Sequence, residues 1–212
     1  MKFTRRNLIG GAGALALAGA ASPLALPTSH AKEAEITPGE DGLYHQDWFV
    51  ESFLNLKDDL TEAADEGKHF AILWEQRGCP YCRELHRVNF ARPEIREYIK
   101  ANFNILQLDI WGPRKVTDFD GKEMGERELA QRWRVNFTPA MNFFPKDVAK
   151  VAGKVGREAE IFRMPGYFKP FHFMASFEYV RAGRTKELGF QRFIQEKGDR
   201  MRKEGKNMEM WK

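Results

Sequence analysis

Apolar and polar positions follow two periods along the chain, and together they predict a mixed α/β domain. Between Trp48 and Ala64 the apolar side chains recur at helical spacing, whereas His69–Trp74 is a short apolar run flanked by charge, typical of a buried central strand. Further helices are expected from Cys79 through Phe90, over Glu94–Asn102, Arg127–Trp133 and Phe171–Arg181, and from Leu188 onward; further strands are expected over Asn104–Ile110, Ala140–Phe144 and Ala159–Arg163.

Turn signals and connections complete this architecture. Asp120 and Gly121 separate two strand-like arms within Lys115–Met124, which predicts a hairpin inserted in the domain. Because helices connect the strands, part of the central sheet should be parallel. We therefore expect a signal segment over residues 1–31, a polar linker over 32–43, one domain over 44–182 and a C-terminal helical extension over 183–212.

The N-terminus has the features of an export signal. Three basic residues precede Leu8–Ala21, an apolar run of 14 residues that is shorter than a transmembrane helix, which needs about 20. Ser29–Ala31 offers small residues at the cleavage positions, so the mature chain should begin near Lys32. Thr4–Ile9 resembles a twin-arginine signal, although an ordinary Sec signal that contains two arginines would also fit. We expect a bacterial protein exported to the periplasm, with no stable membrane insertion after cleavage.

The charge of the whole chain is misleading about its partners. The sequence has 34 Lys and Arg against 30 Asp and Glu, and its isoelectric point is near 9.0. Three of the basic residues belong to the leader; taking them from 34 leaves 31 against 30, a net charge near +1. So weak a field gives no reason to expect nucleic acid as a partner, and the basic residues from Lys197 onward fit a solvated surface.

Cys79 and Cys82 are the only cysteines among the 212 residues, and they follow the first predicted strand. On a helix that begins at Cys79 both lie on one face about a turn apart, so their sulfurs can form and reopen a disulfide. The unpaired N–H groups and positive dipole of a helix start favour the thiolate of Cys79, and Pro80 suits the first helical position. A redox pair is the favoured interpretation, with a metal-chaperone site and a structural disulfide as alternatives.

Several stretches, taken together, resemble one family. They are Leu73–His86 with its Cys-Pro-Tyr-Cys sequence, Val116–Gly121, Trp133–Ala140 and Met164–Tyr167. Over about residues 45–195 the chain is similar to thioredoxin-fold proteins, most of all to the SoxW-type periplasmic thioredoxins and more distantly to the C-terminal domain of the DsbD transporter. The resemblance implies a thioredoxin fold in which Cys79 attacks a substrate disulfide and Cys82 resolves the mixed disulfide.

Thr138 and Pro139 are the second element that the resemblance assigns to the site. It implies that Pro139 follows a cis peptide bond, faces the cysteine pair and presents the backbone of Thr138 to an extended substrate beside Cys79. The alternative is an ordinary proline at the start of a strand. Pro80 and Tyr81, between the cysteines, are expected to contact the substrate together with Thr138.

Proton transfer has several candidate residues. Many thioredoxins have a buried acid six residues before the first cysteine, where this chain has Leu73. Glu75 projects to the same side if the strand continues, so it is our candidate relay; the alternative is a strand-end carboxylate in water. Arg77 either favours the thiolate of the first cysteine or is a solvated loop charge. His86, one helical turn after the second cysteine, is a proton partner, a third metal ligand or, the favoured interpretation, partly buried packing.

These features predict an exported thiol–disulfide oxidoreductase that reduces protein disulfides. Thiol exchange needs no cofactor, the sequence has no glycine-rich phosphate loop, and we expect no metal site. The resemblance implies a membrane dithiol donor of the CcdA or DsbD kind, and periplasmic proteins of sulfur oxidation or cytochrome maturation as acceptors. Trp74, Tyr81 and Phe137 are candidates for an apolar rim that contacts such partners, Trp74 being equally suited to the core. The alternatives are a DsbA-like oxidant or isomerase, a copper or zinc chaperone, and a binding scaffold whose thiols matter little.

Overall fold

The structure is a computed structural model, and it describes residues 36–206. The predicted leader, the expected mature start near Lys32 and the first residues of the predicted linker lie outside the described residues, as do residues 207–212. Within the described range, no helix has both the length and the apolar content needed to cross a bilayer.

Strands and helices follow one another largely as the apolar pattern predicts. The strands are β1 (His69–Glu75), β2 (Phe103–Asp109), β3 (Lys115–Thr117), β4 (Glu123–Gly125), β5 (Ala140–Phe143) and β6 (Phe162–Pro165). The helices are α1 (Leu56–Asp65), α2 (Pro80–Glu84), α3 (Pro93–Asn102), α4 (Glu126–Arg132), α5 (Gly156–Ala159), α6 (Pro170–Arg181) and α7 (Phe190–Lys203). A π-helical segment, Leu85–Phe90, continues α2, and short 3₁₀ turns lie at Val148–Lys150 and Arg184–Lys186.

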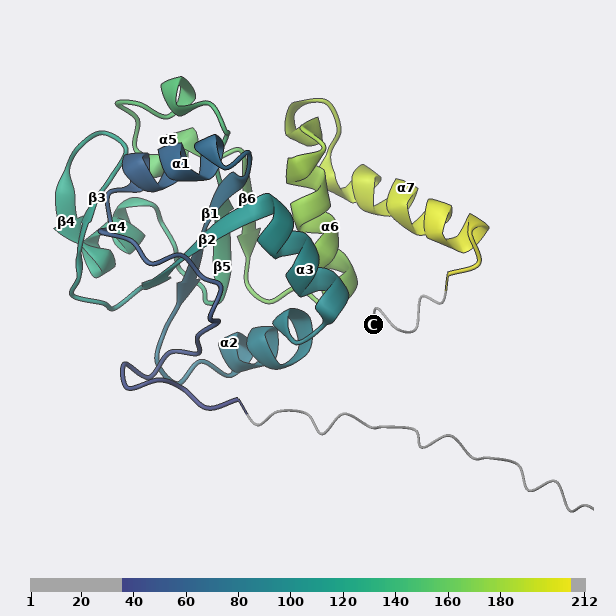
Figure 1. The fold of residues 1–212 in the computed structure, drawn as a ribbon, viewed down its shortest axis with the longest axis horizontal. Helices are drawn as coiled ribbons and strands as arrows, with labels where there is room; N and C mark the ends of the chain where they lie inside the picture. Colours follow the sequence, from purple (N-terminus) through teal and green to yellow (C-terminus); the bar gives the residue numbers. More distant parts are fainter. Residues whose placement is uncertain (1–35, 207–212) are drawn as a thin grey trace, which may run out of the picture. The chain divides into compact units, whose positions relative to one another are not determined.

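Four strands form one mixed sheet in the order β2-β1-β5-β6 (Figure 1). The pair β1 and β2 is parallel, as the helical crossover between them requires, and β5 is antiparallel to both β1 and β6. The β3 and β4 strands pair separately around a turn in which the Asp118 N–H donates to the Lys122 carbonyl at 2.9 Å. The expected thioredoxin fold, with its mixed sheet, inserted hairpin and additional C-terminal helix, is confirmed.

Successive side chains of β1 face two helical layers, which is why every position of this strand is buried. Phe70, Ile72 and Trp74 belong to the apolar cluster that includes α1 and α4, whereas Ala71 and Leu73 belong to the cluster that includes α3 and α6. The strand continues to Glu75, which therefore takes the same face as Leu73. This is the face covered by the helical segment that follows the cysteines.

The helix expected over residues 48–64 begins only at Leu56. Asn55 is its N-cap and accepts a hydrogen bond from the Lys57 N–H, and Leu54 before it has a left-handed backbone with φ of 63°. The segment before it is not helical: the Phe49 N–H donates to the Gln46 carbonyl at 3.2 Å in a turn, and the Val50 N–H donates to the Ile105 carbonyl at 3.0 Å. Trp48 and Phe49 pack on the domain from this segment, whereas Phe53 is fully exposed, so apolar spacing alone predicted too long a helix.

Two further elements have bounds that differ from those predicted. The strand expected over 159–163 is Phe162–Pro165, because the residues before it form the short α5. The C-terminal helix begins at Phe190 and continues to Lys203, through residues that the sequence marks as polar. Lys197 is not solvated as expected: it is 5% exposed and pairs with Glu178 of α6, and burial lowers its pKa although the Glu178 carboxylate opposes this.

Candidate active site around the cysteine pair

The cysteines lie where β1 turns into α2. Gly78 takes a left-handed backbone with φ of 69°, which lets the chain reverse direction immediately before the helix. Cys79 is the N-cap, and its sulfur accepts the Cys82 N–H at 3.1 Å. Pro80 occupies the first helical turn, where its missing N–H leaves no bond unmade. The local geometry is the helix start that the spacing predicted.

Cys79 and Cys82 form a disulfide, with an S–S distance of 2.18 Å and a Cα–Cα distance of 5.2 Å. Cys79 is 3% exposed and Cys82 is fully buried, so the sulfur nearer to solvent belongs to the first cysteine. Among the described residues, no group of three or more His, Cys, Asp or Glu side chains is arranged to hold a metal ion. His86 is therefore not part of such a ligand group here.

The loop before β5 contacts the disulfide. The peptide bond between Thr138 and Pro139 is cis, and the Thr138 hydroxyl lies 3.4 Å from the Cys79 sulfur. Ala140, the next residue, begins β5 and is paired with Trp74 of β1. The sheet thus positions the Thr138–Pro139 loop against the start of α2.

An apolar groove of about 510 Å³ lies beside this contact. It is lined by Tyr81, Phe137, Thr138, Pro165, Gly166 and Tyr167. The Tyr81 and Tyr167 rings are stacked at 6.1 Å, and Phe137 is 66% exposed. Of the three residues expected to form an apolar rim, Tyr81 and Phe137 do so. Trp74 is buried in the core instead, where its indole N–H donates to the Asn142 side-chain oxygen at 2.8 Å.

Tyr167 is held in place by the buried Asn89 of the π-helical segment. Its hydroxyl donates to the Asn89 side-chain oxygen at 3.1 Å, and the Asn89 amide donates to the Phe168 carbonyl at 2.9 Å. Burial raises the pKa of Tyr167 above its ordinary value, which keeps the hydroxyl protonated as the donor. One wall of the groove is therefore fixed by hydrogen bonds to the helix that carries the cysteines.

Glu75 is fully buried, so the alternative of a carboxylate in water is wrong. Its two oxygens lie 3.0 Å from His86 Nε2 and 2.5 Å from Gln107 Nε2. His86 is also fully buried, where the packing interpretation expected partial burial, and contacts the rings of Phe49 and Phe90. In addition it makes polar contacts through both ring nitrogens, since its Nδ1 lies 3.0 Å from the Gln46 amide. We call Glu75 and His86 the buried pair.

Arg77, whose role the sequence left open, is directed to the N-terminal segment. Its guanidinium donates twice to the Asp41 carbonyl, at 3.0 and 3.3 Å, and its side chain packs over Gly42. Through these contacts Arg77 anchors the end of the predicted linker.

Four polar residues of this site were not singled out from the sequence: Gln46, Asn89, Gln107 and Tyr167. For Gln107 there was a signal, because it is a polar residue on the apolar side of a buried strand, directly opposite Leu73 in the sheet register. For Gln46 there was no signal, because it lies between the predicted linker, which ends at residue 43, and the predicted helix, which begins at Trp48.

Of the comparisons with known proteins, the family model agrees with this fold. The family model described as a thioredoxin-like domain matches residues 56–181. A thioredoxin-fold protein from Helicobacter pylori is 21% identical, with 68% of this chain and 94% of that chain covered and a TM-score of 0.48. A thioredoxin from Thermus thermophilus is 20% identical, with 62% and 87% covered and a TM-score of 0.47. The oxidised DsbD C-terminal domain of Neisseria meningitidis is 15% identical, with 61% and 96% covered and a TM-score of 0.40. Structural similarity of this size says nothing about activity, and no curated protein sequence matches the chain.

Proposed function

We propose that this chain, which belongs to the thioredoxin-like family and is a thiol–disulfide oxidoreductase, works as an exported reductase of protein disulfides. The family model matches more than half of the chain, and its span includes the bonded cysteine pair. Within the family we assign the chain to the SoxW-type periplasmic thioredoxins. The stretches that carry this assignment are the Cys-Pro-Tyr-Cys sequence, Val116–Gly121, Trp133–Ala140 and Met164–Tyr167.

One observation carries the proposal: the sulfur nearer to solvent contacts a residue that lines an apolar groove. Cys79 contacts the Thr138 hydroxyl, and Thr138 also lines the groove with Tyr81 and Phe137. An extended substrate segment placed in this groove would bring a disulfide to Cys79, while its backbone could pair with that of Thr138 next to Pro139. The exposed rings of Tyr81 and Phe137 favour apolar side chains next to the substrate cysteine.

The reaction would proceed in two exchanges. In the reduced protein the Cys79 thiolate, favoured by the helix start, attacks one sulfur of the substrate; a bond forms between them and the other substrate sulfur leaves as a thiolate. Cys82 then loses its proton and attacks the Cys79 sulfur, which restores the internal disulfide and releases the second substrate thiolate. The substrate gains two electrons and the protein loses two. We assign uptake of the Cys82 proton to Glu75.

The electrons must come from another dithiol, because thiol exchange itself carries no electron store. We propose a membrane donor of the CcdA or DsbD kind, and export of the chain by its twin-arginine-like leader to the periplasm. The substrates would be periplasmic proteins with accessible disulfides, among them those of sulfur oxidation or cytochrome maturation.

A test with insulin as the disulfide substrate and dithiothreitol as the electron source addresses the activity. The mature chain should accelerate insulin reduction, Cys79→Ser should abolish the acceleration, and Cys82→Ser should accumulate a stable mixed disulfide through Cys79. A Cys79→Ser protein that is as active as the unchanged chain would overturn the proposal.

A redox titration against dithiothreitol decides the direction of electron flow. A midpoint near the −270 mV that is typical of thioredoxin supports a reductase, whereas a value near −120 mV, typical of DsbA, would indicate an oxidant. Stoichiometric binding of Cu(I) that survives a competing chelator would favour the metal-chaperone alternative.

A further inference from the structure

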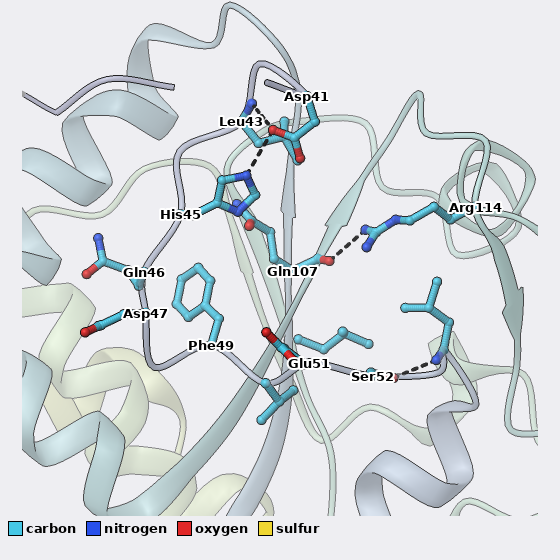
Figure 2. Close-up of a pocket in the computed structure, with 13 residues that line it drawn as sticks. Asp41, Leu43, His45, Gln46, Asp47, Phe49, Glu51, Ser52, Gln107 and Arg114 are labelled. Atoms are coloured by element: carbon cyan, nitrogen blue, oxygen red, sulfur yellow. Dashed lines mark hydrogen bonds and ion pairs between the residues drawn. The ribbon is translucent and has the colours of Figure 1, made fainter. Parts of the chain in front are cut away.

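Gln46 reaches the buried pair from a polar pocket at the surface. The pocket has a volume of about 430 Å³ and is lined by the segment from Asp41 to Leu54 together with β2 and Arg114 (Figure 2). Gln46 and Gln107 both line it, and they are also the two side-chain amides that contact the buried pair. The buried pair is thus separated from this pocket only by two side-chain amides: that of Gln46 next to His86 and that of Gln107 next to Glu75.

The orientation of the Gln46 amide follows from Trp48. The Trp48 indole N–H can only donate, and it lies 3.2 Å from the Gln46 side-chain oxygen. The amide nitrogen of Gln46 therefore faces His86 Nδ1, at 3.0 Å. Because an amide NH₂ can only donate, Nδ1 must accept, and it carries no proton.

The proton of a neutral His86 then lies on Nε2, which donates to Glu75 at 3.0 Å. Gln107 is oriented by the same logic: its Nε2 donates to the Tyr44 carbonyl at 2.7 Å and to the second Glu75 oxygen. Glu75 accordingly accepts from two neutral donors. With His86 uncharged, neither of these donors brings a positive charge to the buried carboxylate.

We infer that Gln46 is a positioning residue that holds His86 as the neutral Nε2–H tautomer, so that Glu75 is left without a compensating cation and can accept a proton. The last step rests on the proposed function. When Cys82 attacks the Cys79 sulfur, its proton passes to the Glu75 carboxylate, the Cys79–Cys82 bond forms and the substrate thiolate leaves. A doubly protonated His86 would neutralise Glu75 and weaken it as an acceptor.

Other charged groups around the pocket have partners of their own. Asp41 pairs with His45 at 2.9 Å, and Arg114 contacts Glu126 and the Gln107 carbonyl. The remaining titratable groups are Asp47 and Glu51, which line the same pocket, and Tyr44, whose ring lies 5.8 Å from that of His86. A pH titration of the pair must therefore be compared with a variant that changes only charge.

The direct test is a ¹⁵N NMR spectrum of the histidine side chains in the full mature chain. At neutral pH, His86 should show an unprotonated Nδ1 and a protonated Nε2. In Gln46→Glu the new carboxylate accepts from Nδ1, so His86 should carry protons on both nitrogens. Gln131→Glu, the same substitution on the exposed side of α4, should leave His86 unchanged. If His86 of the unchanged chain is protonated at Nδ1, the inference is overturned. This measurement uses the unchanged chain, so it does not depend on whether a variant folds.

The functional test is the rate at which Cys82 resolves a preformed mixed disulfide between Cys79 and glutathione. At pH 7 the rate in Gln46→Glu should fall roughly tenfold, and its pH profile should shift. This loss is smaller than the full rate contribution of a positioned acid or base, because Glu75 itself is still present. Gln131→Glu should match the unchanged chain. Gln46→Met, which cannot donate, should give an intermediate profile.

The two readouts separate this inference from the proposed function. A changed His86 spectrum in Gln46→Glu with an unchanged pH profile would overturn the role of the tautomer in exchange. Absence of insulin reduction by the unchanged chain would instead count against the proposed reductase, while the spectrum would still decide the tautomer.

Discussion

Glu75 and Asp118 are both carboxylates in the protein interior, and their partners differ in kind. Asp118 accepts from the Arg132 guanidinium at 2.7 Å and from the Trp133 indole at 3.0 Å, and its other oxygen accepts the N–H groups of Phe119 and Gly156. Glu75 accepts from one imidazole and one amide. One acid has a permanent cation as partner, and the other has neutral donors.

This difference separates an acid with a structural role, Asp118, from an acid with a proposed chemical role, Glu75; we call them the structural acid and the chemical acid. Asp118 joins the hairpin, α4 and α5, and proton uptake there would weaken four hydrogen bonds at once. Burial raises the pKa of Asp118 above its ordinary value, and the Trp133 indole, the Phe119 N–H and the Arg132 charge oppose part of this rise. Glu75 has no such cation among its two side-chain donors, which suits a group that gains and loses a proton in each cycle.

The largest expected effect is on stability, at the structural acid. Asp118→Ala leaves the buried Trp133 indole and the Gly156 N–H without acceptors, so the free energy of unfolding should fall by about 3–5 kcal/mol. Urea unfolding of the oxidised protein measures this. At a temperature where the variant is folded, its insulin reduction should stay within about twofold of the unchanged chain. A much larger loss of rate would mean that Asp118 also serves the chemistry.

The next effect is on rate, at the chemical acid. Glu75→Gln removes the proton acceptor, so the resolving step at pH 7 should slow by roughly 10- to 100-fold and its pH profile should flatten. Stability should change by only about 1 kcal/mol, because loss of an uncompensated buried charge offsets the disturbed hydrogen bonds. Stopped-flow exchange with glutathione disulfide measures the rate.

Glu126→Gln is the matched control for this substitution. Glu126 is 1% exposed and, like Asp118, has an arginine partner, Arg114. The same chemical change there should lower stability and leave the pH profile of exchange as it is. If the pH profile were unchanged in Glu75→Gln as well, Glu75 would not be the relay.

The sequence predicted the parts of this comparison that depend on local pattern. The buried strand β1, the helix start at Cys79 and the hairpin all lie where apolar spacing, Pro80 and the Asp120–Gly121 pair placed them. Glu75 could be proposed because side chains alternate along a strand. In each case the signal lies within a few neighbouring residues.

What could not be predicted depends on contacts between distant segments. Gln46 and His86 are 40 residues apart, and Tyr167 and Asn89 are 78 apart, so no local spacing brings them together. The excess length of the helix predicted over residues 48–64 has the same origin: Trp48 and Phe49 are apolar because they cover the α3 and α6 side of the sheet from a non-helical segment before α1. The sequence shows the spacing of the apolar residues, but it does not show which surface of the fold each of them covers.

Asp59 offers a third environment: it is a buried acid that has no proposed task and, within the part of the chain that the structure describes, no cation as partner. Ser52 donates to one of its oxygens, and the other has no hydrogen-bond partner among residues 36–206. Burial raises the pKa of Asp59 to about 6, above the ordinary 3.8, although the Ser52 hydroxyl opposes this. Because the folded pKa lies above the unfolded one, its contribution to stability is complete below pH 3.8 and is lost as the pH rises through about 6.

Asp59→Asn should therefore stabilise the protein only where the unchanged chain must ionise this carboxyl. At about pH 7.5 the variant should gain about 1–2 kcal/mol, reduced from the full shift because part of the group is solvated, and at about pH 4 the gain should vanish. Urea unfolding at the two pH values measures it. An equal gain at both would show that packing, and not ionisation, is responsible.

The smallest effect is expected at Arg77, a cation two residues before Cys79. If the site works without a cationic partner, Arg77→Gln should change the rate of exchange by less than about twofold, since its guanidinium is directed to the Asp41 carbonyl and surface charges are screened. The rate should also be insensitive to added salt. A large, salt-dependent loss of rate would mean that Arg77 supports the Cys79 thiolate, and the contrast with the arginine-paired Asp118 would then no longer separate chemistry from structure.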